Sequence, residues 1–174
     1  SMELVPRISR AQSMDALTSQ ALCAGYKAAL IGAELSPRFF PLLMTAAGTV
    51  TPAQVLVLGA GVAGLQAIAT ARRLGAVVSA FDVRSSTKEQ VESLGAKFIN
   101  IQTNQKQDGV YAKELTQADQ ELQQQLLLQT IKSQDVVIST ALIPGKKAPI
   151  LITKQMVEAM KTGSIIIDLA AING

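Results

Sequence analysis

The sequence has 174 residues, of which 48% are hydrophobic and only 3% aromatic, and it carries a formal net charge of +3. This length is enough for one domain, or a little more, with an aliphatic core, and the scattered basic residues form no run that would indicate nucleic-acid binding. One cysteine and no histidine exclude an internal disulfide, a cysteine metal cluster and a Ser-His-Asp triad. They also remove most zinc sites, so we expect no metal.

The chain before residue 50 is predicted to be helical. Small and apolar residues recur at steps of three and four between positions 14 and 31, which predicts a helix with a narrow face for close packing. Cys23 lies in this stretch and is expected to be a small buried residue. Ser36-Pro37 reads as a cap followed by a first-turn proline, so a second helix is predicted over about 39–47.

After Pro52 the chain alternates between short apolar runs and helical patterns. This alternation predicts an α/β fold, a doubly wound parallel sheet of Rossmann type with strand order 3-2-1-4-5, preceded by two helices. We divide the chain into an N-terminal helical segment, 1–50, that packs on the sheet domain, and a Rossmann-type domain, 51–174, and interpret the whole as a fragment of a longer chain. The predicted strands are 55–58, 77–82, 97–101, 135–139 and 164–169. The predicted helices are about 62–74, a segment capped by Ser86 and Glu89 and ended by Gly95, 111–132 with Leu115, Leu122 and Leu126 facing inward, and a segment capped by Thr153.

A glycine-rich turn links the first predicted strand of the sheet to its helix. Gly59, Gly61 and Gly64 stand at the spacing G-x-G-x-x-G directly after the apolar run 55–58. Such a turn lets the backbone approach a pyrophosphate, which then lies at the helix N-terminus, where unpaired N–H groups favour an anion. The sequence therefore predicts a dinucleotide site, with Val62 among the contacts; a turn kept only for packing is the alternative.

An acid at the end of the second predicted strand indicates which dinucleotide is bound. Asp82 lies 23 positions after Gly59, close to the usual spacing of about 20 for the acid that binds the ribose hydroxyls. Its carboxylate would repel a 2′-phosphate, so we expect NAD(H) rather than NADP(H), with Val83 beside it. Arg84 complicates this prediction, and we expect its side chain to flank the adenine or face solvent.

A third loop follows the fourth predicted strand. The backbone of Thr140, Ala141 and Leu142 is expected to contact the nicotinamide ribose, and a plain proline turn is the alternative. Ahead of the sheet, Arg7, Gln12 and Asp15 surround the start of the first helix. From spacing alone, surface residues and a helix cap are the favoured interpretation of these three.

Several stretches resemble the NAD(H)-binding component (alpha subunit, domain I) of proton-translocating NAD(P) transhydrogenases. The similarity covers nearly the whole chain, and the specific motifs are Arg7-Ile-Ser-Arg-Ala-Gln-Ser-Met-Asp15 and Tyr111-Ala-Lys-Glu. Thr140-Ala-Leu-Ile-Pro-Gly-Lys-Lys-Ala-Pro is similar to alanine dehydrogenases too. The loop 102–110 differs from the family's, so the resemblance implies no lid contacts for it.

The resemblance implies roles that reverse the interpretation of the N-terminal group. Gln12 would hydrogen-bond near the nicotinamide, while Arg7 and Asp15 would brace its loop. Tyr111 would belong to a mobile loop that closes over the nucleotide, and Thr18 would supply a hydroxyl near the same site.

The resemblance also implies an activity, partners and a location. The chain would be the NAD(H) domain of a Si/Re-specific NAD(P) transhydrogenase, inactive alone, in which hydride passes from NADH to NADP⁺ on a partner domain. The partners would be an NADP(H)-binding component and a membrane component that translocates protons, and the parent would be a homodimer. The domain would lie on the cytoplasmic face of a bacterial inner membrane or the matrix face of a mitochondrial one. An alanine dehydrogenase domain and a non-catalytic NAD(H)-sensing domain are the alternatives.

Overall fold

Five parallel strands form the central sheet of the computed structural model, which describes residues 2, 5–6, 8–99, 117–142 and 147–171, with only the backbone of 117–120. The strand order is β5-β4-β3-β6-β7, the order that the sequence predicted. Every neighbouring pair runs parallel. The strands are β3 Gln54–Leu58, β4 Val77–Phe81, β5 Lys97–Phe98, β6 Val136–Ser139 and β7 Ile165–Asp168.

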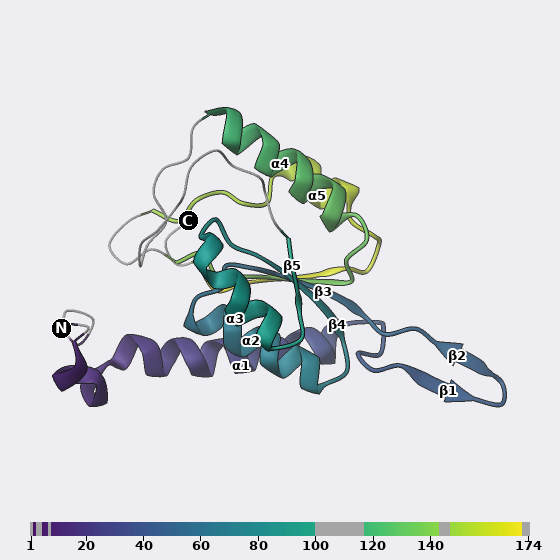
Figure 1. The fold of residues 1–174 in the computed structure, drawn as a ribbon. Coiled ribbons are helices and arrows are strands. Elements are labelled where there is room, and N and C mark those ends of the chain that lie inside the picture. The colour runs from purple at the N-terminus through teal and green to yellow at the C-terminus, as the bar shows by residue number, and fades with distance from the viewer. Residues whose placement is uncertain (1, 3–4, 7, 100–116, 143–146, 172–174) are drawn as a thin grey trace.

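Helices cover both faces of this sheet (Figure 1). One face carries α1 Ala16–Leu35, α2 Val62–Arg73 and α3 Lys88–Ser93, and the other carries α4 Gln117–Ile131 and α5 Lys154–Ala159. Two short 3₁₀ helices, η2 Ser9–Met14 and η3 Ser85–Thr87, precede α1 and α3. The predicted cap of α5 is confirmed, because the Thr153 side chain accepts a hydrogen bond from the Met156 N–H at 3.3 Å.

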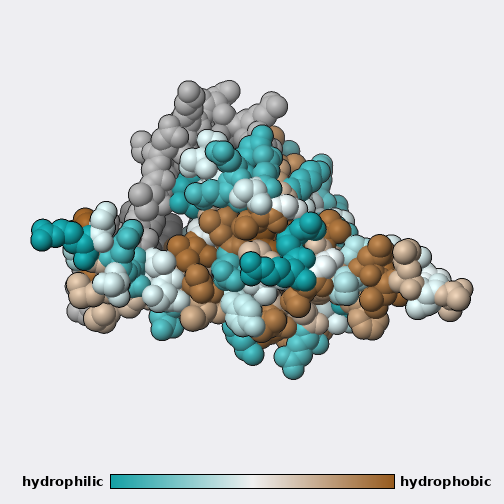
Figure 2. Space-filling model, turned by 60° about the horizontal axis from the view of Figure 1, so that its bottom comes forward, coloured by the Kyte–Doolittle hydropathy of each residue, from teal (hydrophilic) through white to brown (hydrophobic). Residues whose placement is uncertain are grey.

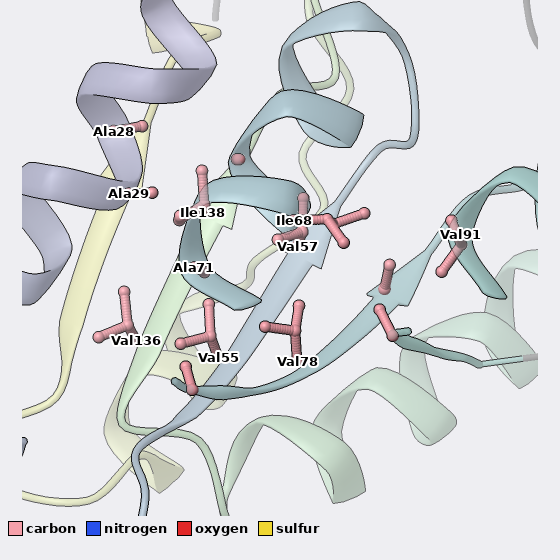
Figure 3. Close-up of a cluster of buried hydrophobic side chains, with 14 of the residues drawn as sticks. Ala28, Ala29, Val55, Val57, Ile68, Ala71, Val78, Val91, Val136 and Ile138 are labelled. Carbon is pink, nitrogen blue, oxygen red and sulfur yellow. The ribbon is translucent and has the colours of Figure 1, made fainter. Parts of the chain in front are cut away.

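The core is aliphatic and lies in two layers, one on each face of the sheet. On one face of the sheet, valines of β3, β4 and β6 meet small side chains of α1 and α2, including Ala28, Ala29 and Ala71 (Figure 3). On the other face, Leu127 and Ile131 of α4 pack against the sheet. Because successive side chains of a strand point to opposite faces, a sheet covered on both sides needs strands that are apolar throughout.

Helix α1 packs against α2 through a face of small residues. The sequence predicted such a face for close packing. The buried residues are Gly25, Ala28, Ala29 and Gly32. A Cβ atom at Gly25 would lie 2.1 Å from the carbonyl oxygen of Ala63, so only glycine allows this approach. The expectation that Cys23 is buried is wrong: it lies on the exposed side of α1.

The second helix predicted over 39–47 is also wrong. This segment contains an antiparallel hairpin, β1 Leu43–Thr45 and β2 Gly48–Val50, that projects away from the sheet domain (Figure 1). Counted from the predicted cap Ser36, Pro41 would fall in the second turn of the proposed helix, where proline removes a hydrogen bond and clashes with the preceding turn. The hairpin and its base expose several large apolar side chains, Met44 among them at 73% (Figure 2).

Two local predictions fail within the sheet domain. The capping box of Ser86 and Glu89 does not form, since α3 begins after Thr87 and its N-cap makes no side-chain hydrogen bond. In α4, Leu122 is 46% exposed, whereas Leu127 and Ile131 are buried, so the inward face differs from the predicted one. The prediction for Leu115 lies outside the described residues.

Asp135 lies at the amino ends of the central strands and links neighbouring segments there by hydrogen bonds. Its carboxylate, only 6% exposed, accepts hydrogen bonds from the Gln54 N–H at 2.8 Å and from Lys161 Nζ at 2.9 Å. Arg38 Nε lies 3.8 Å away. This buried, paired carboxylate has a structural role at the edge opposite the predicted site.

Candidate functional site

The glycine turn has the local geometry that the fingerprint predicts. Strand β3 ends at Leu58, and Gly59 follows with φ +99°, a conformation that favours glycine. The Gly59 N–H donates to the Phe81 carbonyl oxygen at 2.8 Å, which fixes the turn against β4. Gly61 is then the N-cap of α2, so this helix points its first N–H groups at the carboxyl edge of the sheet.

The space around two further glycines fits a bound pyrophosphate. Among the residues that the structure describes, none has a heavy atom within 4 Å of a Cβ atom built at Gly61, so they leave this side of the turn open. A Cβ atom at Gly64 would lie 1.8 Å from the Gly59 carbonyl oxygen, so glycine there is needed for the turn itself. The turn, with Val62 as the first residue of α2, therefore presents a helix N-terminus of the kind that binds an anion.

Asp82 joins the second strand to this turn. Its Oδ2 atom accepts a hydrogen bond from the Ala60 N–H at 2.7 Å, across the gap between the two loops. Its Oδ1 atom accepts the Arg84 N–H at 2.8 Å. The acid thus lies beside the glycine turn, as a group that binds the adenosine ribose should, and Val83 follows it, half-buried.

The Arg84 side chain does not face solvent, which was one of the two positions expected for it, and its place relative to the adenine stays a prediction. Its side chain folds back on Asp82, with Nε 3.0 Å from Oδ1 and Nη2 2.9 Å from Oδ2. The guanidinium is 19% exposed and the carboxylate 6%. Arginine matches a carboxylate through two parallel hydrogen bonds, and this pair is of that strong kind.

The hydrogen bonds at Asp82 also set its ionisation. Burial of the carboxyl raises its pKa, but hydrogen bonds from the Arg84 side chain and from the backbone N–H groups of Ala60 and Arg84 outweigh burial, and the pKa is lowered. A lowered pKa in the folded state means that the ionised form adds stability above the unfolded pKa of about 3.9. This stability is lost as the pH falls through the depressed folded pKa.

We therefore expect the difference in unfolding free energy between the wild type and Asp82→Asn to depend on pH. The wild type should be the more stable protein at pH 6, and the difference should shrink as the pH falls below about 4, where the Asp82 carboxyl of the unfolded chain binds a proton while the folded protein still holds it ionised. Urea unfolding at a series of pH values measures it. A difference of equal size at pH 3 and pH 6 would contradict the depressed pKa.

Thr140 links the third loop to the glycine turn. Its N–H donates to the Leu58 carbonyl oxygen at 2.8 Å, and its Oγ1 lies 3.0 Å from the Gly59 oxygen and 3.2 Å from the Leu58 oxygen. Ala141 and Leu142 follow directly, and the Leu142 side chain is exposed. Their contact with the nicotinamide ribose stays a prediction, but the loop is fastened beside the turn.

Thr140→Val should weaken NADH binding about five- to tenfold, because valine keeps the shape and removes the hydrogen bond that fixes the two loops. Titration followed by NADH fluorescence measures the change. Thr140→Ser, which keeps the hydroxyl, is the matched control and should bind like the wild type. If valine binds as tightly as serine, the hydroxyl has no positioning role.

The N-terminal candidates form a second group at the start of α1. Asp15 is the N-cap of this helix: its Oδ1 accepts the Thr18 N–H at 3.0 Å and its Oδ2 accepts the Thr18 hydroxyl at 2.7 Å. Gln12 lies exposed in η2. Arg7 and Tyr111 lie outside the described residues, so of this group the structure describes Gln12 and the cap formed by Asp15 and Thr18.

Sequence reasoning missed two features of the site. It foresaw neither the side-chain hydrogen bond of Thr140 to the turn nor the fork between Arg84 and Asp82. A signal for the first existed, because a threonine directly after a buried strand can bond to the backbone of the neighbouring turn. The Arg84–Asp82 pair had no signal in the sequence, since the side chain of an arginine two residues from an acid can adopt many rotamers that do not contact it.

A parallel sheet, a glycine turn at its topological switch point and an acid at the end of the next strand define a Rossmann-type dinucleotide-binding domain. The chain belongs to the family described as alanine dehydrogenase/PNT, C-terminal domain, whose model matches residues 28–174. The sequence-based assignment to an NAD(H)-binding domain agrees with this membership.

Individual relatives are similar over most of this chain. The first part of NAD(P) transhydrogenase subunit alpha from Rhodospirillum rubrum is 60% identical over 173 residues, which are 97% of this chain and 45% of that protein. The crystal structure of transhydrogenase from Sinorhizobium meliloti is 55% identical with a TM-score of 0.89, and the match covers 100% of this chain and 46% of that one. An alanine dehydrogenase of Staphylococcus epidermidis is 32% identical over 166 residues, 93% of this chain and 40% of that protein.

The chain thus spans somewhat less than half of the relatives that it matches. Within the part of the chain that the structure describes, none of the helices is long and apolar enough to cross a membrane.

Proposed function

We propose that this chain is the NAD(H)-binding part of a proton-translocating, Si/Re-specific NAD(P) transhydrogenase. The observation that carries the proposal is the 60% identity to a transhydrogenase alpha subunit over 97% of the chain. The site supports it, since an open glycine turn and an adjacent buried acid suit an unphosphorylated adenosine ribose.

Each group of residues would do a separate part of the work. The glycine turn and Val62 would hold the pyrophosphate, Asp82 and Val83 the adenosine ribose, and the backbone of 140–142 the nicotinamide ribose. When bound, NADH supplies the hydride. The residues of this chain would position the nicotinamide and exclude water, which are the main contributions that a protein makes to direct hydride transfer.

The N-terminal group would act at the nicotinamide end. Gln12 would hydrogen-bond near the nicotinamide, and Asp15, through its bonds to Thr18, would fix the backbone that carries Gln12. Arg7 would brace the same loop and Tyr111 would close over the nucleotide. In this arrangement no residue of the chain has to act as an acid or a base.

The remaining parts of the proposal concern the assembly. The partners would be an NADP(H)-binding component and a membrane component, with the proton step in the membrane component, and the parent would be a homodimer. This domain would lie on the cytoplasmic face of a bacterial inner membrane or the matrix face of a mitochondrial one.

Titration of the 174-residue chain with NADH, NADPH and ADP-ribose tests the proposal at the level of binding. NADH and ADP-ribose should bind, NADPH should bind at least about tenfold more weakly, and the chain alone should transfer no hydride. Binding of NADPH in preference to NADH would overturn the proposal.

Assays on the complete parent protein separate transhydrogenase from the two alternatives. Hydride exchange between NADH and an NADP⁺ analogue supports transhydrogenase. Consumption of NADH with pyruvate and ammonia would instead identify an alanine dehydrogenase, the activity named for the 32% identical relative. Binding with neither activity would leave a nucleotide-sensing domain.

A further inference from the structure

A pocket of about 300 Å³ lies at the amino edge of the sheet, on the side from which the hairpin projects (Figure 1). Its walls come from two segments that are far apart in the chain. They are the linker 37–38, just before the hairpin, and the turn 161–164 between α5 and β7, with Asp135 between them. The glycine turn lies at the opposite edge of the sheet, so this pocket is separate from the predicted dinucleotide site.

The fold holds both walls of the pocket in place. Arg38 Nη2 donates a hydrogen bond to Thr51 Oγ1 at 2.7 Å, which fixes the linker to the other end of the hairpin. Gly163 has φ +85°, and a Cβ atom there would lie 3.4 Å from the side chain of Pro37. The turn therefore lies close to the linker, and both present their side chains to the same hollow.

The charges that line the pocket do not balance. Arg38 and Lys161 share a single carboxylate, that of Asp135, which is 6% exposed, whereas the two basic side chains are 44% and 46% exposed. Lys161 Nζ lies 2.9 Å from Oδ1, but Arg38 Nε lies 3.8 Å from Oδ2, beyond the reach of a hydrogen bond. Because Asp135 is the one acid among the described residues of the lining, these groups carry a net charge of +1.

The same two side chains keep donors to offer to a ligand. A guanidinium has five N–H donors and an ammonium three. Within the described part of the chain, Arg38 uses Nη2 for Thr51, and Lys161 donates to Asp135. Thr162 adds a hydroxyl group to the lining. A planar guanidinium fork beside a second cation is a combination that suits the oxygens of a phosphate group.

We propose that this pocket binds a phosphate group, either as the free ion or as part of a small phosphorylated molecule. Arg38 and Lys161 supply the charge and most of the donors, and Asp135 positions the lysine. A volume of about 300 Å³ is at the lower end for small-molecule sites, which agrees with a small ligand. A phosphate bound here joins the linker to the turn, and the inference does not depend on the binding of NAD(H).

Titration with inorganic phosphate at constant ionic strength, followed by ¹H–¹⁵N NMR, tests the proposal. The amide signals of Thr162 and Gly163 should shift and saturate. Arg38→Gln should weaken binding at least about tenfold, the value of a hydrogen bond to a charged group. This variant leaves Lys161 paired with Asp135, so it should fold, and circular dichroism checks that it does. A parallel titration with glycerol 3-phosphate distinguishes the two sources, since tighter binding of the ester indicates a phosphorylated molecule.

Two further variants locate the bound phosphate. Lys154→Gln removes an exposed lysine of α5 that does not line the pocket, so it should bind phosphate like the wild type. The glycine turn is a second place where phosphate can bind, and Gly61→Ala should block that place while the signals of Thr162 and Gly163 still shift. Arg38→Gln should in turn keep the wild-type affinity for NADH.

Three results would overturn the inference. They are a wild type in which these two signals do not saturate with either phosphate compound, a folded Arg38→Gln protein that binds phosphate as tightly as the wild type, and a response that disappears in Gly61→Ala. A wild type that binds NADH but no phosphate at the amino edge defeats this inference alone. A wild type that binds phosphate there but no NADH defeats the proposed function alone.

Discussion

Gly61→Ala should abolish measurable NADH binding, with a loss of at least about a hundredfold, while leaving the fold intact. The new methyl group would enter the side of the turn where no described residue has a heavy atom within 4 Å, and this is the side on which the pyrophosphate is expected. Gly61 has φ −81°, which alanine adopts without strain. NADH titration and a thermal melt measure the two effects.

Gly64→Ala is the matched comparison, because it stands in the same motif. Its Cβ would lie 1.8 Å from the Gly59 carbonyl oxygen, so it should lower stability as well as binding. Two outcomes at Gly61 speak against the assignment of the site. They are an alanine variant that binds NADH normally and one that melts as early as Gly64→Ala.

Gly25→Ala should destabilise the protein by about 2–3 kcal/mol, the cost of overpacking a tight interface. The Cβ would lie 2.1 Å from the Ala63 carbonyl oxygen and 2.9 Å from its carbon, and backbone atoms of a helix cannot move aside alone. Alanine raises helix propensity by about 1 kcal/mol, and the steric cost exceeds this gain. Urea unfolding measures the difference.

Gly32→Ala is the control within the same helix. Its Cβ would lie 3.0 Å from a side-chain atom of Val136, and a side chain can rotate or shift slightly. The loss should therefore stay below about 1 kcal/mol, with the gain in propensity offsetting most of it. Equal effects of the two substitutions would mean that the α1–α2 approach is not limiting.

Local patterns in the sequence were enough to predict the strands, their order and the glycine turn. A run such as Val55–Leu58 between polar or small residues has no stable place except inside a sheet covered on both sides. The order then follows from right-handed crossovers, and the site from the switch point. These rules do not depend on details of side-chain packing.

The failures come from choices between alternatives of similar energy. In α4, leucines at 122, 126, 127 and 128 are compatible with more than one inward face, and the structure selects the face that includes Leu127 and Ile131. Asp82 was correctly expected beside the turn, but its partner Arg84 depends on a side-chain rotamer, which no spacing encodes. Over 39–47 the apolar residues predict a helix, but Pro41 disfavours one, and a hairpin forms there instead.

At Gly25 the backbone of α1 lies directly against the backbone of Ala63 in the first turn of α2. We therefore expect α1 and this turn to move together. Neither helix can slide on the other without a collision, so a displacement of the helix that follows the glycine motif must carry α1 with it. Asp15 and Thr18 lie at the N-terminus of α1. We therefore expect a shift of the first turn of α2 on nucleotide binding to be felt at the start of α1, where the Asp15–Thr18 cap lies.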